Sequence, residues 1–372
     1  SIIGLTRTGA KPSEIVREAA LFCSRNQDGF GGLATLTIAA RLAPMLSEET
    51  LYHALLRGIV EIADNSGNAP RRPRQELDGE AYPSGQLKRW FRHWVRSRHR
   101  DGAERVLLTA IARGQLPAEI SDLLFAGVSD RIYADGGHLF DFTNKALELL
   151  DIIGWEHAAE ILPLVVRQIV NARGGEELAH WSHPVDIVGP LRRIEAELPE
   201  VLGAGSRHGW NGDESLTQTL LGDDPLKILQ ALREALELGA EPAVLSRRVA
   251  YAAALRLARF PKTNEVGDWF NAQHTFNFAN AVHQAVRRNP TPDVVRALFH
   301  AAMAVYHDRF LNVPAAKLPG ANGSLDGLPK GAAELRALLL KTLDQRSEID
   351  EAGRIVARYV RLGHPFEPLV DA

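Results

Sequence analysis

The strongest constraint on the fold of this chain is a segment that occurs twice. Residues 133–144 and 269–280 share the pattern aromatic-x-Asp/Asn-x-x-His-x-Phe-Asp/Asn-Phe-small-Asn, with His138 and His274 at the same place in it. Histidine, phenylalanine and asparagine are scarce in the chain, so agreement in register is improbable by chance. The repeat predicts an internally duplicated protein in which each half carries one copy.

Apolar residues recur at helical spacing through most of the chain, and strand patterns are nearly absent. This predicts an all-α fold, an array of short paired helices in one compact two-lobed domain. Pro199 is expected to end the helix before it. Besides the two copies, the predicted helices cover residues 11–23, 33–46, 51–64, 85–100, 103–113, 117–126, 155–170, 191–198, 225–238, 242–258, 292–310, 331–343 and 348–362.

A Gly- and His-containing connection at residues 171–184 places the boundary between the halves, at residues 1–172 and 173–372. Two long Gly-rich loops, residues 203–224 and 312–330, are predicted to gate a site, because long irregular loops in compact domains are often functional. Residues 366–372 look like the start of another helix, and we expect a native C-terminal segment to follow.

The composition and charge of the chain limit the classes of function that it can have. The formal net charge of −3 gives no overall attraction to nucleic acid or membrane. No apolar run long enough for a membrane span and no signal peptide are recognised, so we expect a cytoplasmic protein without nucleic-acid or membrane partners. Cys23 is the only cysteine, which excludes an iron–sulfur cluster held by thiolates. Any metal must therefore be held by imidazole and carboxylate.

The histidines suggest such a metal site. On a helix, His138 and Asp141 share one face and could reach one cation, while the neighbouring phenylalanines would limit water. Each half offers about three histidines, and three imidazoles leave coordination positions open for substrate. The predicted metal ligands are His53, His138 and His157 in the first half and His183, His274 and His300 in the second.

Two further residues are predicted to be catalytic, namely Asp141 and Arg57. Arg57 lies one helical turn after His53, where it could hold an anionic group of the substrate or pair with Asp64. Buried histidines that only form hydrogen bonds are the alternative explanation for the whole set. Residues 307–309 are expected to be solvated.

Basic residues cluster with tryptophan and phenylalanine at residues 88–105. A solvated helix face is the simplest interpretation. A docking surface for an acidic electron-transfer protein is the second. Nucleic-acid binding ranks third, because nearby acidic residues dilute the positive charge.

Several segments resemble known proteins. Residues 31–37, 51–58 and 135–145 resemble the helical domain of Rieske-type proteins, and His183–Pro184 with Gly189 is similar to the questin-oxidase-like oxygenases of natural-product pathways. The resemblance implies a helical module linked to redox chemistry. The single cysteine departs from a Rieske protein, because it cannot hold that cluster.

These observations favour a histidine-ligated, metal-dependent oxidoreductase or oxygenase that acts on a small organic molecule. Iron in a mono- or dinuclear site is the first expectation and another transition metal the second; non-covalent haem is a variant. The alternative is a non-enzymatic helical scaffold or partner-binding protein. Nucleotide-binding and serine-hydrolase motifs are not found.

Overall fold

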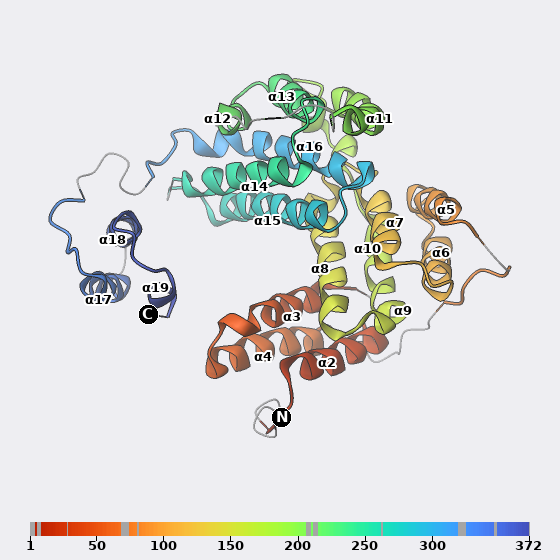
Figure 1. The fold of residues 1–372 in the computed structure, drawn as a ribbon, viewed down its shortest axis with the longest axis horizontal. Helices are drawn as coiled ribbons and strands as arrows, with labels where there is room; N and C mark the ends of the chain where they lie inside the picture. The colour runs from red at the N-terminus through yellow and green to blue at the C-terminus, as the bar shows by residue number, and fades with distance from the viewer. Residues whose placement is uncertain are drawn as a thin grey trace.

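The protein is all-α, as predicted (Figure 1). The computed structural model describes residues 4–5, 9–27, 29–67, 74–79, 82–205, 210, 215–261, 263–318, 325–345 and 348–371. Every regular element in these ranges is a helix, and none of them contains a strand. No helix in these ranges combines the length and apolar character that crossing a bilayer requires.

The N-terminal helices pack on one another at one end of the molecule (Figure 1). The close crossing of α3 (Gly31–Leu42) and α4 (Glu48–Asp64) depends on a glycine. A Cβ atom on Gly58 would lie 2.8 Å from Cα of Leu36, so only glycine fits there. The elements are α2 (Pro12–Asn26), α3 (Gly31–Leu42), η1 (Ala43–Met45) and α4 (Glu48–Asp64).

A second group of helices continues from this end toward the middle of the molecule. The long helix α8 (His138–Ile153) packs against α3 and against α15 (Val266–Arg288), and so connects the N-terminal helices to the later part of the chain. The other elements of the group are α5 (Ser84–Arg96), α6 (Arg100–Ala112), α7 (Pro117–Ser129), η2 (Ala134–Gly137), η3 (Trp155–His157), α9 (Ala158–Ile161), α10 (Pro163–Asn171), η4 (Gly175–Glu177) and η5 (Ala179–Trp181).

The third group surrounds helix α16 (Pro292–His307). Residues 294–306 of this helix are all buried, because it is packed by α7, α11, α13, α14 and α15. Such all-round burial is typical of a central helix. The other elements of the group are α11 (Val188–Gly205), α12 (Ser215–Leu220), α13 (Pro225–Glu237), α14 (Pro242–Ala258), α15 (Val266–Arg288) and η6 (Asp308–Asn312).

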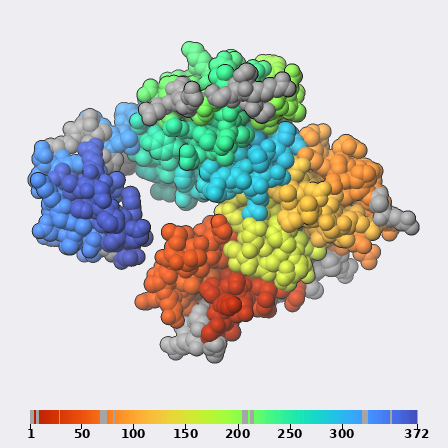
Figure 2. All heavy atoms as spheres, in the orientation of Figure 1, coloured from red at the N-terminus to blue at the C-terminus, as the bar shows by residue number. Residues whose placement is uncertain are grey.

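One hydrophobic core extends from Val16 to Tyr306. The predicted boundary after residue 172 falls at the end of α10, between segments that share this core. The last helices, α17 (Ala332–Leu343), α18 (Ile349–Arg361) and α19 (Glu367–Val370), have a small core of their own. They stand apart from the rest of the molecule (Figure 2).

Three predicted helices differ from the observed ones. Helix α11 continues through Pro199, because apolar residues on both sides of the proline, such as Leu198 and Val201, are buried. The predicted helix 85–100 is broken at Arg98, which has a left-handed backbone conformation. The Arg98 guanidinium donates hydrogen bonds to the carbonyl oxygens of Asn171 and Ala172, and these bonds hold the break in place. The predicted helix 155–170 is divided into η3, α9 and α10.

The predicted loops lie partly outside the description. Residues 206–209 and 211–214 of the loop 203–224 and residues 319–324 of the loop 312–330 are not among the described residues. The end of the first loop is helical, since α12 begins at Ser215.

Much of the basic cluster at residues 88–105 is neutralised within the chain. Lys88 pairs with Asp122 and Asp293, and Arg92 and Arg96 pair with Asp130. Asp130 is buried, and these ion pairs join α5 to α7 and α16. These three cations therefore hold helices together.

Candidate functional site

The two histidines of the repeated segment meet in the structure. His138 begins α8 and His274 lies within α15, and their ring centroids are 4.6 Å apart at an interplanar angle of 67°. Burial, with a smaller contribution from the charge of His138, lowers the pKa of His274 below its ordinary value. The sequence pattern thus marks a real contact between distant segments.

A left-handed turn brings the first copy against α15. Tyr133, Asp135, Gly136 and Gly137 all have positive φ angles. A Cβ atom on Gly137 would lie 2.5 Å from Cβ of Phe278, so the turn approaches α15 more closely than any other residue type allows. This approach places the Tyr133 ring 5.0 Å from the Phe278 ring.

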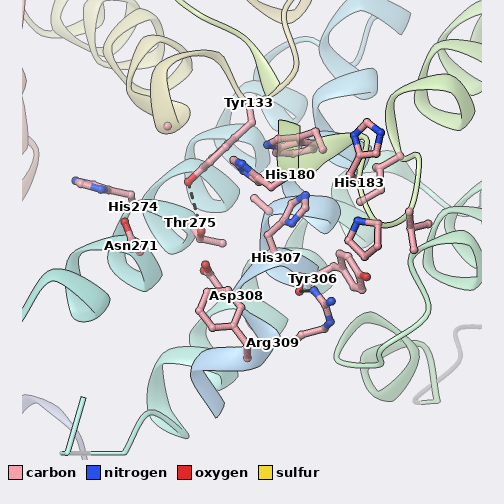
Figure 3. Close-up of a pocket in the computed structure, with 17 residues that line it drawn as sticks. Tyr133, His180, His183, Asn271, His274, Thr275, Tyr306, His307, Asp308 and Arg309 are labelled. Carbon is pink, nitrogen blue, oxygen red and sulfur yellow. Dashed lines mark hydrogen bonds between the residues drawn. The ribbon is translucent and has the colours of Figure 1, made fainter. Parts of the chain in front are cut away.

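A pocket of about 560 Å³ lies beside this turn, within the size range of small-molecule sites. We call it the α15–α16 pocket (Figure 3). Its walls come from the turn, η5 and the segment after it, α15, and the end of α16 with η6. The lining residues are Tyr133, Gly136, His180, Trp181, His183, Pro184, Val185, Ile187, Asn271, His274, Thr275, Ala304, Tyr306, His307, Asp308, Arg309 and Phe310.

His307, the last residue of α16, is a neutral imidazole in the wall of this pocket. Its ring centroid is 4.5 Å from that of Trp181 and 5.1 Å from that of His180. Burial, together with the charges of His180 and Arg309, lowers the pKa of His307 to about 4. A helix C-terminus favours a cation, but here burial outweighs that effect. Its Nε2 has no hydrogen-bond partner within the described chain.

Asp308 follows directly and is buried. Burial raises the pKa of Asp308 to about 6, although a hydrogen bond from Thr275 and the charge of Arg256 both act to lower it. Its Oδ2 atom has no hydrogen-bond partner among the described residues. Asp308 is therefore a buried carboxyl group in the wall of the pocket, with one unpaired oxygen.

Thr275 connects Asp308 to the left-handed turn. The Tyr133 hydroxyl oxygen lies 3.3 Å from Oγ1 of Thr275 (Figure 3). Burial raises the pKa of Tyr133 to about 12, so the phenol keeps its proton. Either hydroxyl group can be the donor in this contact.

The turn that carries Asp308 is held in place by Arg256 of α14. The Arg256 guanidinium donates to the carbonyl oxygens of Val305 (3.2 Å) and Leu221 (3.1 Å). The Asn312 side chain in turn donates to the carbonyl oxygen of Arg256 (3.0 Å). These bonds tie η6 to α14 and fix the position of Asp308.

The six predicted metal ligands do not converge. Only His138 and His274 are in contact, and across the residues that the structure describes no three His, Cys, Asp or Glu side chains are arranged to hold a metal ion. The other four lie on separate segments of the chain. His53 is exposed on α4 with Arg57, His157 is half-buried in η3, and His183 is exposed at the pocket wall.

His300 has a different environment from the one predicted. It is fully buried on α16, and its Nε2 atom lies 2.8 Å from Oε1 of Glu195. The other carboxylate oxygen of Glu195 accepts from Arg192 at 2.8 Å. His300 is therefore a hydrogen-bonded core residue, the alternative considered for the histidines.

Asp141 lies on α8, half-buried and outside the pocket lining. Burial raises the pKa of Asp141, while the charges of Lys145 and His138 oppose the shift. Its proximity to His138 agrees with the shared helix face that the sequence predicts.

Sequence reasoning missed the residues at the end of α16. Residues 307–309 were expected to be solvated, yet Asp308 is buried. The apolar run before these residues could have predicted their burial. When a helix is buried on all sides, its last residues also lie in the interior. Thr275, directly after His274, was also overlooked.

Comparison with protein-family models, with curated proteins and with solved structures finds no match. The chemistry of the pocket is therefore the basis for a functional argument.

Proposed function

We propose that the protein is an enzyme that transfers a proton on a small organic molecule bound in the α15–α16 pocket. The single observation that carries the proposal is a pair of unpartnered polar atoms on consecutive residues. Nε2 of His307 and Oδ2 of Asp308 are both buried and lack a hydrogen-bond partner among the described residues. Unpaired buried polar atoms are costly, and a substrate that pairs with them removes that cost.

Asp308 is the general base in this proposal. A carboxyl group with a pKa of about 6 is mostly ionised at neutral pH, yet it is more basic than an ordinary aspartate. Its free oxygen removes a proton from a C–H bond next to a carbonyl group. The electrons of that bond move to the carbonyl oxygen and form an enolate, and return of the proton at another carbon completes an isomerisation without any co-reactant.

His307 supplies the second half of the chemistry. Because its pKa is about 4, the imidazole is neutral at physiological pH. In the tautomer that carries the proton on Nε2, it donates a hydrogen bond to the developing enolate oxygen. A base with a raised pKa beside an acid–base group with a lowered pKa is a recurrent arrangement in proton-transfer enzymes.

Tyr133 and Thr275 position the base. A hydrogen bond from Thr275 acts on the Asp308 carboxyl group, while Oδ2 of Asp308 stays unpaired. Tyr133 keeps its proton, and its hydroxyl oxygen lies 3.3 Å from Oγ1 of Thr275, so it supports Thr275 from the side of the turn.

The iron oxygenase predicted from sequence shares the small organic substrate with this proposal but differs in how the substrate is activated. The three-histidine groups it requires are not assembled in the described residues. The proposed proton transfer, by contrast, is argued from the side chains of the pocket.

Exchange of carbon-bound protons with solvent deuterium tests the proposal. The probe is 2-tetralone in D₂O, followed by proton NMR with the wild-type protein, Asp308→Asn and the control Asp344→Asn. Asp344 is exposed at the end of α17, outside the pocket lining. We expect the wild type and the control to accelerate exchange equally, and Asp308→Asn to lose about 100-fold or more. Equal rates for the wild type and Asp308→Asn would overturn the proposal and favour the scaffold.

A further inference from the structure

We infer that the substrate of the α15–α16 pocket carries a carboxylate group and that Arg309 binds it. This inference rests on the proposed function, because it names the class of molecule that the same pocket accepts. It assigns a specificity role to a residue that takes no part in the proton transfer itself.

Arg309 is held in a defined position at the pocket wall. The central carbon of its guanidinium lies 3.9 Å from the centroid of the Tyr306 ring. One of its nitrogens, Nη1, donates to the carbonyl oxygen of Tyr306 at 3.2 Å. A guanidinium stacked on an aromatic ring is already ordered, so it loses less freedom when it binds a ligand.

Arg309 has no protein counter-ion among the described residues. Its guanidinium contacts the Tyr306 ring and the Tyr306 carbonyl oxygen, neither of which carries a charge. The adjacent carboxylate, Asp308, takes its hydrogen bond from Thr275 and is influenced by the charge of Arg256. The positive charge of Arg309 is therefore available to a molecule in the pocket.

The two neighbouring side chains diverge. Asp308 points toward Thr275, whereas the guanidinium of Arg309 lies on the side of Tyr306 (Figure 3). A substrate that spans the pocket can thus place its anionic group on Arg309 and its acidic C–H bond at Asp308. Separation of the two negative charges avoids repulsion between the substrate and the catalytic base.

The rest of the lining favours an aromatic or cyclic monoacid. Trp181, Tyr306 and Phe310 provide aromatic surface, and Asp308 is the only acidic residue in the described lining. A single guanidinium with a planar fork matches the geometry and single charge of a carboxylate. The substrate class that results is a small cyclic or aromatic keto acid.

Equilibrium binding of a matched pair of probes tests this inference without requiring turnover. The probes are 2-naphthoate and its neutral isostere 2-naphthamide, measured by calorimetry or by quenching of tryptophan fluorescence. The variants are Arg309→Gln, Arg309→Lys, Asp308→Asn and the control Arg247→Gln. Arg247 is exposed on α14 and lies outside the pocket lining.

We expect wild type and Arg247→Gln to bind 2-naphthoate at least tenfold more tightly than 2-naphthamide. Arg309→Gln should abolish that preference and leave the affinity for 2-naphthamide unchanged, which also shows that the pocket is intact. Arg309→Lys keeps the positive charge but cannot bind a carboxylate with two parallel hydrogen bonds. Its preference for 2-naphthoate should therefore lie between those of the wild type and Arg309→Gln.

Asp308→Asn separates this inference from the proposed function. It should bind 2-naphthoate at least as tightly as the wild type, although it loses proton exchange. Equal affinity of the wild-type protein for the two probes, no binding of either, or full retention of the preference in Arg309→Gln overturns the role of Arg309. Failure of the exchange experiment with an Arg309-dependent preference overturns only the proton transfer.

Discussion

The two copies of the repeated segment have similar sequences but different backbones. In the first copy, residues 133–137 form a left-handed turn, and the helix begins only at His138. In the second copy, the corresponding residues lie within the continuous helix α15. The difference follows from the residues before the histidine, Gly136 and Gly137 in one copy and Ala272 and Gln273 in the other, because glycine adopts positive φ without strain.

This difference gives the copies different roles. The turn of the first copy carries Tyr133 into the pocket, where it contacts Thr275 of the second copy. The equivalent aromatic residue of the second copy, Trp269, instead packs against Phe260 with ring centroids 4.8 Å apart. A shared pattern therefore indicated that the two segments matter together, while local glycines decided what each contributes.

The largest expected effect on stability comes from replacing a glycine in the left-handed turn of the first copy. Gly137→Ala introduces a Cβ atom against Phe278 at a φ of 88°, so we expect a loss of about 2–4 kcal/mol in the free energy of unfolding. The equivalent change in the second copy, Gln273→Ala, lies on an exposed helical position and should alter it by less than about 0.5 kcal/mol. Urea denaturation measures both; similar values would contradict the comparison.

The pH dependence of stability should be opposite in variants of the two consecutive pocket residues. Between pH 4 and 6 the folded state holds a proton on Asp308 and none on His307, while in the unfolded state, with ordinary pKa values of 3.8 and 6.5, the reverse is true. The two contributions cancel in the wild type. Asp308→Asn leaves only His307, whose stabilisation is present above pH 6.5 and is lost as pH falls toward 4.

In His307→Gln only Asp308 remains, and its stabilisation is present below pH 3.8 and is lost as pH rises through 6. Relative to the wild type, the slope of unfolding free energy against pH should change by about +1.4 kcal/mol per pH unit in Asp308→Asn and about −1.4 in His307→Gln. Urea denaturation at several pH values from 4.5 to 6 measures these slopes. Slopes of the same sign would show that the two groups do not titrate as described.

Removing one hydroxyl group sharpens the contrast between the aromatic residues of the two copies. Tyr133→Phe loses the hydrogen bond to Thr275 and should lower the free energy of unfolding by about 0.5–1.5 kcal/mol. It should also slow deuterium exchange of 2-tetralone, because Asp308 is then less well positioned. Trp269→Phe should leave the exchange rate unchanged, and an equal reduction in both variants would remove the distinction.

The smallest expected effect concerns the two repeated histidines. The charge of His138 contributes to the lowered pKa of His274, after burial. His138→Gln should therefore raise the pKa of His274 slightly, because burial remains, and NMR titration of the imidazole measures this shift. A pKa of His274 that is unaffected by the substitution would mean that the two rings are not coupled.

The sequence was sufficient for the all-α fold, because helical periodicity reports which face of each helix is buried. It also singled out His138 and His274, which are in contact. Pro199 was misjudged, because tertiary packing of α11 outweighs the local preference of proline. The pocket residues His307 and Asp308 were missed, because three consecutive polar residues normally predict a solvent-exposed segment. Only the central position of α16 in the fold shows that they are not exposed.

The proposed proton transfer depends most on the environment of Asp308, and an NMR titration of its side-chain carboxyl carbon measures that environment directly. Asp308→Asn provides the assignment of the signal. We expect a pKa of about 6, so that Asp308 ionises in a pH range where ordinary aspartates are already charged. A pKa near 3.8 would mean that Asp308 is solvated, and it would contradict the proposal that this residue is the base of an enzyme.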